Sequence, residues 1–329
     1  MEKITMADVA KAAGVSKSTV SQYLNKRFEY MGEKTKLKIE EAIEKLGYQP
    51  NYLARSLKQK RTSMVGIIVA NSIHYFSMEV IHAIEDFCQK HDLHAIVCNA
   101  DDDPDKEKKY IEMLRGKQVD GLIIFPTGQN NDLYESMMRN GYPVVFMDRK
   151  VENLDVFSVL TDNEASTYKA IKQFIEKGHQ NIAFAVQLLS ISPRRDRLEG
   201  YKKALKDAGL QVDPNLIIES SLAEMKSKLE KLFSSENKPT ALFAANDRIF
   251  LIVMEFLKEK GIKLGKDLEF VVFDNIPFAH LLESPLSFIV QPAAEMGEKA
   301  AELLFEQINK EEIEPVKLVF PSRMVRGDQ

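Results

Sequence analysis

Polar and aromatic side chains follow several apolar runs that predict the strands of open α/β sheets. Ligands of such sheets bind beyond the carboxyl ends of the strands. Carboxylates and amides hydrogen-bond hydroxyls, and planar rings cover apolar faces, so these residue types suit a sugar-like molecule. Any one of them also fits a helix cap or a turn. The candidate ligand-binding residues are Tyr75, Phe76, Asp148, Arg149, Arg197, Asn246, Asp247 and Asp274.

Three of these candidates, Asp148, Asp247 and Asp274, carry carboxylates that are suited to acid/base catalysis. The sequence pattern, however, offers no phosphate-binding glycine loop, nucleophile elbow, metal-spaced His/Cys cluster or His–carboxylate dyad beside them. The six histidines are scattered along the chain. We therefore expect a binding site that uses no metal or cofactor, and no enzyme.

Residues 5–25 predict two short helices joined at Gly14. Thr5 and Asp8 form a variant of the capping box, Gly14 suits a left-handed helix end, and Ser16 suits a new N-cap. The outer face is polar and weakly basic, which suits a DNA major groove, although an ordinary helical hairpin fits the same pattern. We expect phosphate contacts from one set and base contacts from another: Thr5, Ser16, Thr19, Ser21 and Asn25 for phosphates, and Lys17, Ser18 and Gln22 for bases.

A third helix is predicted between Gly32 and Gly47, because Ile39, Ala42, Ile43 and Leu46 follow helical spacing. The cationic segment 50–62 comes next and has a short helical pattern. About eight residues are too few for a stable isolated helix in water, so this segment needs a partner to fold. A flexible basic linker is the alternative.

From residue 64 onward, apolar runs alternate with helical patterns. This alternation predicts parallel sheets covered on both faces, and two successive sets predict two doubly wound subdomains with a cleft between them. The last segment, from Pro292, is long enough to cross back between them. The predicted strands are 64–70, 93–98, 121–125 and 144–147 in the first set, and 182–186, 216–218, 241–244 and 269–273 in the second.

The segment ITMADVAKAAGVSKSTVSQYLN resembles the helix-turn-helix of LacI/GalR-type bacterial repressors. The resemblance continues through GYQPN and ARSL, and then through FAAND, FDN and QPAAEMG at residues 243–247, 273–275 and 291–297. It implies a DNA-binding head, a hinge helix and a periplasmic-binding-protein-like body. It also implies DNA contacts by Tyr48, Ala54 and Leu57, with Leu57 wedged into a minor-groove base step, and effector contacts by the strand-end residues above.

The implied domains are a helix-turn-helix head at 1–49, a hinge at 50–61 and an effector-binding and dimerisation domain at 62–329. Within that last domain we expect an N-subdomain at about 62–161 and 292–321, and a C-subdomain at about 162–291 and 322–329.

Charge is divided unevenly along the 329 residues. Residues 1–61 hold 13 Lys and Arg against 7 Asp and Glu, whereas the remainder holds 32 against 42. A basic head on an acidic body is typical of a nucleic-acid-binding module fused to another domain. There is no apolar run long enough to span a bilayer and no signal-peptide core, and the two cysteines lack metal-ligand spacing, so we expect reduced thiols and a cytoplasmic protein.

Together these features predict a homodimeric, operator-binding repressor controlled by a sugar or sugar acid, with no membrane partner. An activator, or a repressor whose ligand is a corepressor, would use the same parts. Two departures from the family pattern bear on specificity. Gln22 stands where most relatives carry arginine. Glutamine favours adenine, whereas arginine favours guanine. The cluster Arg194, Arg195 and Arg197 favours an acidic effector.

Overall fold

The computed structural model describes residues 4–29, 31–49, 61–282, 286–310 and 312–326. Contacts between Cα atoms divide the chain into two units, residues 1–62 and 63–329, which we call the head and the body. Each unit is described by itself.

The head consists of α1 (Met6–Ala13), α2 (Lys17–Leu24) and α3 (Glu33–Leu46). The predicted end signals are confirmed. The Asp8 carboxylate accepts hydrogen bonds from the Thr5 backbone N–H and hydroxyl at 2.8 and 2.7 Å. Gly14 and Gly47 adopt left-handed conformations after α1 and α3, and Ser16 accepts a hydrogen bond from the Thr19 N–H. Local capping chemistry therefore fixes where each helix begins or ends.

A small apolar core holds the three head helices together. Its fully buried members are Val9, Val20 and Ile39, and Tyr48 packs into it with only 8% of its surface exposed. Helix α2 buries Val20 in this core and leaves Lys17, Ser18 and Gln22 exposed on its polar face.

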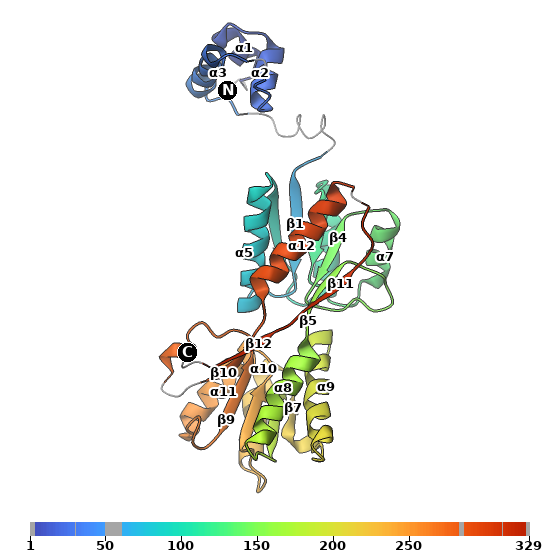
Figure 1. The fold of residues 1–329 in the computed structure, drawn as a ribbon, viewed down its shortest axis with the longest axis vertical. Helices are drawn as coiled ribbons and strands as arrows, with labels where there is room; N and C mark the ends of the chain where they lie inside the picture. Colours follow the sequence, from blue (N-terminus) through green and yellow to red (C-terminus); the bar gives the residue numbers. More distant parts are fainter. Residues whose placement is uncertain (1–3, 30, 50–60, 283–285, 311, 327–329) are drawn as a thin grey trace. The chain divides into compact units, whose positions relative to one another are not determined.

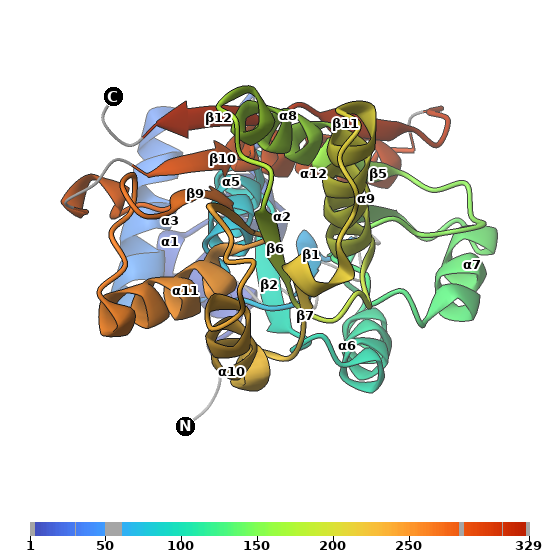
Figure 2. The same ribbon diagram turned by 90° about the horizontal axis from the view of Figure 1, so that it is seen from below.

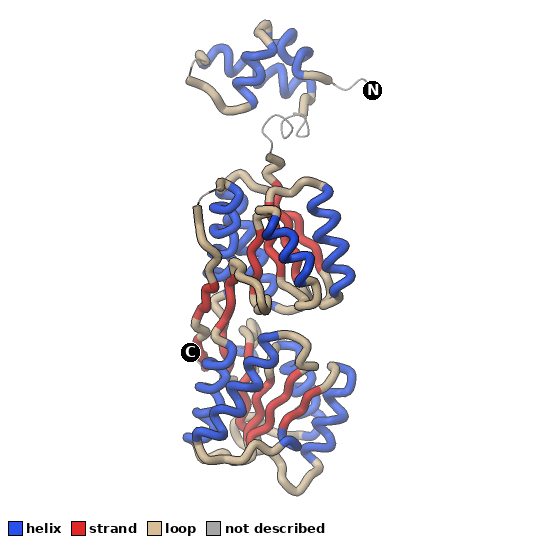
Figure 3. The backbone as a smooth tube through the Cα atoms, turned by 90° about the vertical axis from the view of Figure 1, so that its right-hand side faces the viewer, coloured by secondary structure: helices blue, strands red, loops and turns tan. Residues whose placement is uncertain are grey.

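The body contains two six-stranded sheets, each lying between helices (Figure 3). In the first sheet the strand order is β11-β5-β4-β3-β1-β2, and all neighbouring strands are parallel. The helices of this subdomain include α5 and α12, which pack side by side on one face (Figure 1). Its elements are β1 (Met64–Val69), α5 (Tyr75–Lys90), β2 (His94–Asn99), α6 (Pro104–Gly116), β3 (Gly121–Ile124), α7 (Asn131–Arg139), β4 (Val144–Met147), β5 (Ser158–Thr161), α12 (Ala293–Ile308) and β11 (Lys317–Phe320).

The second sheet has the order β12-β10-β9-β8-β6-β7, in which only the edge pair β10 and β12 is antiparallel. Helices α8 and α9 lie on one side of it, and α10 and α11 on the other (Figure 2). Its elements are α8 (Asn163–Glu176), β6 (Ile182–Val186), α9 (Ser192–Asp207), β7 (Ile217–Glu219), α10 (Leu222–Phe233), β8 (Ala241–Ala244), α11 (Asp247–Lys260), β9 (Glu269–Phe273), β10 (Ser287–Val290) and β12 (Arg323–Arg326), with short 3-10 helices at Pro214–Leu216 and Ala279–Leu281.

The chain passes between the two sheets after β5, after β10 and between β11 and β12. The predicted fold class, a helix-turn-helix head on a body of two doubly wound subdomains, is confirmed. Strands β5, β10, β11 and β12 were not predicted. All four have only four residues and lie next to a crossing, and each has a partner strand that is far away in the sequence: β5 pairs with β11, and β10 pairs with β12.

Candidate functional site

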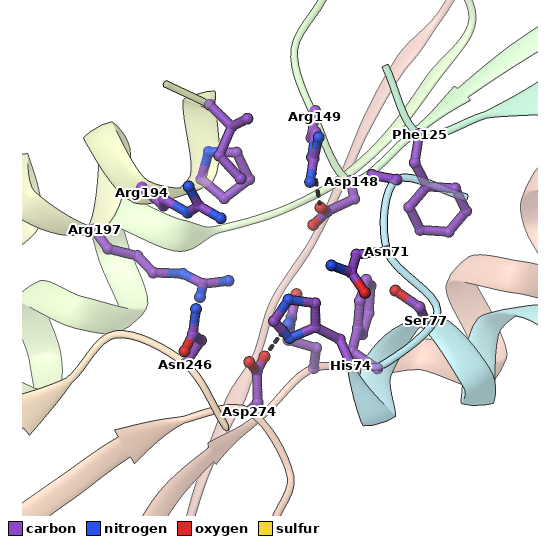
Figure 4. Close-up of a pocket in the computed structure, with 15 residues that line it drawn as sticks. Asn71, His74, Ser77, Phe125, Asp148, Arg149, Arg194, Arg197, Asn246 and Asp274 are labelled. Atoms are coloured by element: carbon purple, nitrogen blue, oxygen red, sulfur yellow. Dashed lines mark hydrogen bonds and ion pairs between the residues drawn. The ribbon is translucent and has the colours of Figure 1, made fainter. Parts of the chain in front are cut away.

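A pocket of about 60 Å³ lies where the carboxyl ends of strands from both subdomains face each other (Figure 4). We call it the inner pocket. One wall comes from the segments after β1, β3 and β4, and the other from the start of α9 and the segments after β8, β9 and β10. The topology therefore gathers strand-end residues that are separated by up to 221 positions, from Ala70 to Gln291.

On the first wall, Asp148 and Arg149 follow β4. The Arg149 guanidinium donates to the Asp102 carboxylate at 2.6 Å and lies 3.8 Å from the Asp148 carboxylate. Burial raises the pKa of Asp148 above its usual value, although the positive charge of Arg149 opposes this shift. Asp148 also has a φ of 69°, a left-handed conformation that an aspartate adopts more readily than most residues.

On the second wall, Arg197 is buried and immobilised. Its guanidinium stacks 3.6 Å from the centre of the Phe273 ring, while its Nε donates to Asn163 Oδ1 at 2.8 Å. The neighbouring Asp274 carboxylate accepts a 2.6 Å hydrogen bond from Gln291 Nε2, and burial raises the pKa of Asp274. The Gln291 Oε1 atom is buried without a hydrogen-bond partner in the described chain, which leaves one acceptor at the pocket wall.

Arg194, unlike Arg149, has only neutral hydrogen-bond partners in the part of the chain that the structure describes. Its guanidinium donates to the Leu188 carbonyl at 2.9 Å and to the Ser190 hydroxyl at 3.4 Å. Among the described residues, no carboxylate lies within ion-pairing distance of Arg194. Burial lowers the pKa of Arg194 to about 10; the positive charges of Arg149 and Arg197 add to this shift, and the carboxylates of Asp102 and Asp148 oppose it only in part. Within the described ranges, the inner pocket therefore presents two guanidiniums without a counter-ion within ion-pairing distance, those of Arg194 and Arg197, and that of Arg197 is already held by Asn163, the Ala245 carbonyl and the Phe273 ring.

The expectation that no His–carboxylate pair lies beside the predicted carboxylates is wrong. His74 Nδ1 lies 2.6 Å from Asp247 Oδ1, across the boundary between the subdomains. Burial alone would lower the pKa of His74, but the hydrogen bond and negative charge of Asp247 outweigh it and raise the pKa. The pair was missed because 173 residues separate its members, and only the fold brings them together.

His74, Asp247 and Asp274 also offer atoms within 4.8 Å of one another, as a metal site would require. Their atoms are already engaged with each other and with the chain. Besides His74, Asp247 accepts from the Tyr75 N–H, and Asp274 accepts from the Asp247 N–H at 3.3 Å. This arrangement is a hydrogen-bonded link across the cleft.

Six of the eight predicted effector residues line the inner pocket: Phe76, Asp148, Arg149, Arg197, Asn246 and Asp274. The other two do not line it. The Asp247 carboxylate is hydrogen-bonded to His74, and Tyr75 is 39% exposed. Asn246 also caps α11, since its side chain accepts from the Ile249 N–H at 2.9 Å. Arg194 also lines the pocket; the sequence had marked it only as a member of the arginine cluster that favours an acidic effector. Lining residues that the effector prediction did not include are Ala70, Asn71, His74, Ser77, Phe125, Ile191, Pro193 and Gln291.

A signal for some of the missed residues existed in the sequence. Asn71 and His74 follow a predicted strand just as Asp148 does, and Gln291 opens the segment QPAAEMG. Ser77 and Phe125 carry no such local signal, because their roles as lining residues depend on which helix and strand face the cleft.

In the head, the three side chains predicted to read bases, Lys17, Ser18 and Gln22, are exposed on α2. Of those predicted to contact phosphates, Thr5 and Ser16 are exposed, whereas Thr19, Ser21 and Asn25 are partly buried. Tyr48 belongs to the head's core instead of its outer face. Ala54, Leu57 and the predicted hinge at 50–60 lie outside the described residues.

Comparison with known proteins matches both units of the chain. Residues 5–51 match the model of bacterial regulatory proteins of the lacI family, and residues 62–326 match that of periplasmic binding proteins and the sugar-binding domain of the LacI family. The probable HTH-type transcriptional regulator EndR of Paenibacillus polymyxa is 46% identical over 94% of this chain and 92% of its own. The HTH-type transcriptional repressor PurR of Aliivibrio salmonicida is 34% identical over 92% of each chain.

Solved structures agree with these matches. The lac repressor dimer bound to operator and an anti-inducer aligns with a TM-score of 0.87 at 25% identity, over 99% of each chain. The regulator CelR in complex with cellobiose aligns with a TM-score of 0.73 at 25% identity, over 99% of this chain and 100% of its own. Within the part of the chain that the structure describes, no helix is long and apolar enough to cross a membrane.

Proposed function

Because the chain belongs to the LacI family of bacterial regulatory proteins, we propose that it is a homodimeric repressor whose operator binding is controlled by an acidic sugar. Like its relatives, it is a DNA-binding transcriptional regulator and not an enzyme. The effector class and the dimer are the parts that we propose.

Arg194 carries the proposal of an acidic effector. The Arg194 guanidinium is half-buried, and among the described residues it has no carboxylate within ion-pairing distance. A ligand that brings a carboxylate or phosphate stabilises it, because a charge-assisted pair forms in a partly desolvated site. The other groups of the inner pocket suit a sugar ring. Phe76 and Phe125 offer planar faces, while Asp274 and Asn246 offer hydrogen bonds to hydroxyls. The CelR structure, which holds cellobiose, supports a carbohydrate ligand.

Exposed apolar side chains support the homodimer. Leu251 on α11 and Phe278 and Leu281 in the segment after β9 are 59%, 69% and 71% exposed, and Met78 on α5 is 50% exposed. Large apolar side chains of this kind that lie in solvent are typical of a surface that another protein covers. A second copy of the chain is the occupant that matches the two-fold symmetry of most operators, and the lac repressor aligned above is itself a dimer.

Control by the effector would follow from the position of the inner pocket between the subdomains. A ligand that binds both walls favours one closure of the cleft, and a coupling of about 1–3 kcal/mol between two sites changes affinity about 5- to 150-fold. The chain that links the body to the head would transmit the change in closure to the paired heads.

The proposal is tested by fluorescence anisotropy with the full-length protein and DNA from upstream of its own gene. Sugar acids, sugar phosphates and neutral sugars are added in turn. We expect specific binding that an acidic sugar abolishes, and an Arg194→Ala variant that needs at least tenfold more of it. Arg139→Ala is the control, because Arg139 pairs with Glu135 at 3.9 Å on α7 and lies outside the inner pocket and the neighbouring cavity.

Release by neutral sugars alone would contradict the acidic effector. Specific binding that appears only when a compound is added would instead establish corepression. Complete absence of specific binding would contradict the repressor itself.

A further inference from the structure

We propose that the effector is at least two sugar units long, and that its second, uncharged unit binds in a separate pocket next to the inner one. This inference rests on the proposed function. The second pocket, here called the outer pocket, has a volume of about 160 Å³. Arg149 and Ile191 line both pockets, so a ligand in the inner pocket lies beside the opening of the outer one.

Hydrogen-bonding atoms at the wall of the outer pocket are buried but unused. Thr127 Oγ1, Asn131 Oδ1 and Arg149 Nε have no partner in hydrogen-bond geometry among the described residues, and Thr127 and Arg149 are only 7% and 6% exposed. The polar neighbours of two of them are more distant: Thr127 lies near the Tyr134 hydroxyl, and Arg149 Nε lies 3.8 Å from the Asp148 carboxylate. Such orphaned groups are rare in folded proteins, because each one costs about 1–3 kcal/mol. Their gathering at one cavity indicates a ligand that supplies the missing partners.

The unused groups include a hydroxyl, an acceptor and a donor. A sugar hydroxyl both donates and accepts, so several hydroxyls on one ring satisfy all three. An oxyanion would satisfy the Arg149 donor but, in the observed orientation of the Asn131 amide, would meet its oxygen instead of its N–H groups. The chemistry of the wall therefore favours a polyhydroxylated ligand.

Charge pairing supports an uncharged second unit. The cations of the outer pocket already have counter-ions, since Lys150 Nζ lies 2.6 Å from Asp196 and Arg195 lies 3.2 Å from Glu152. Arg194 in the inner pocket has no such partner. The acid group of the effector thus belongs in the inner pocket and the neutral unit in the outer one.

Hydrogen bonds from buried side chains fix the segments that line the outer pocket. Glu107 is fully buried and accepts hydrogen bonds from the Thr127 N–H at 2.7 Å and from Asn130 Nδ2 at 2.8 Å, as well as from the Tyr134 hydroxyl. These bonds hold the segment that carries Thr127 in place. On the opposite side the Ser192 hydroxyl accepts from the Lys150 N–H at 2.8 Å, which ties the two subdomains together at the pocket.

The test compares acids of one and two units by isothermal titration of the full-length protein. Gluconate is the one-unit probe, and cellobionate, maltobionate and lactobionate are gluconates that carry one neutral sugar. We expect at least one two-unit acid to bind at least tenfold more tightly than gluconate. In Thr127→Val this ratio should fall to less than threefold.

Thr167→Val is the matched control. Thr167 is also buried with an unpartnered hydroxyl, but it lines neither pocket, so its removal should leave the ratio unchanged. An equal loss in both variants would mean that the effect is structural, and would overturn the inference.

Two further outcomes separate this inference from the proposed function. Equal binding of gluconate and all three two-unit acids, or binding of none of them while a one-unit acidic sugar releases DNA, would overturn the two-unit effector and leave the acidic effector standing. If no acidic sugar binds or releases DNA, both proposals fail.

Discussion

His74 Nδ1 and Asp247 Oδ1 lie 2.6 Å apart and link the segment after the first strand of one subdomain to the first helical turn after β8 in the other. The Tyr75 N–H donates to the same carboxylate at 3.2 Å. This link lies beside the inner pocket and spans the cleft whose closure the effector is proposed to control.

Loss of this link should make stability depend less on pH. His74 has a raised pKa, so its contribution is complete below the unfolded value of about 6.5 and is lost as pH rises through the folded pKa. The pKa of Asp247 is lowered, so its contribution is present above the unfolded value of about 3.9 and is lost as pH falls through the folded pKa. Relative to His74→Asn, the wild type should be more stable by about 1–3 kcal/mol near pH 6.

Urea unfolding of both proteins from pH 5 to 9 measures this difference. The advantage of the wild type should shrink toward pH 9. His82→Asn is a suitable control, because His82 is 78% exposed and lies 3.8 Å from an exposed Asp86. An advantage that stays constant over this range would contradict a charged His74–Asp247 pair.

Gly200 allows α9 to approach α8 closely. A Cβ atom at this position would lie 2.3 Å from the Glu164 backbone carbonyl oxygen, which cannot move without shifting the helix. Gly200→Ala should therefore destabilise the body by about 1–3 kcal/mol, the usual cost of overpacking. Thermal unfolding of the wild type and the variant measures this loss of stability.

The matched variant is Gly116→Ala. Gly116 is the last residue of α6, and nothing lies within 4 Å of the Cβ that the substitution adds. It should be neutral or slightly stabilising, because alanine has the higher helix propensity. Similar losses in both variants would show that helix approach is not the cause.

Gln22 is exposed on α2 at a position predicted to read a base. Glutamine pairs with adenine and arginine with guanine, and a good bidentate contact discriminates by about 1–3 kcal/mol. Gln22→Arg should therefore change the preferred base at one position of each half-site from adenine to guanine without destabilising the head. Selection of binding sites from randomised duplexes measures the preference.

Gln22→Ala serves as the control, and should weaken the preference without creating a new one. An unchanged preference in Gln22→Arg would show that this side chain does not read the operator.

Local signals in the sequence determined most of the fold. The capping residues Thr5, Asp8 and Ser16 and the left-handed Gly14 and Gly47 set helix ends through bonds that span only a few residues. Strands β4, β6, β8 and β9 have the predicted bounds, because a buried parallel strand is a continuous apolar run. Strand ends also indicated which polar residues approach the cleft, and six of the eight candidates line the inner pocket.

Tertiary structure alone decided which of these groups meet. His74 contacts Asp247, which is 173 residues away in the sequence. Arg195 pairs with Glu152, whereas the neighbouring Arg194 has no carboxylate within ion-pairing distance among the described residues. The sequence showed three arginines of the same charge and could not distinguish them, because a counter-ion depends on where distant segments lie. The outer pocket has the same origin, since its unused groups at Thr127, Asn131 and Arg149 belong to separate segments that only the folded chain brings to one cavity.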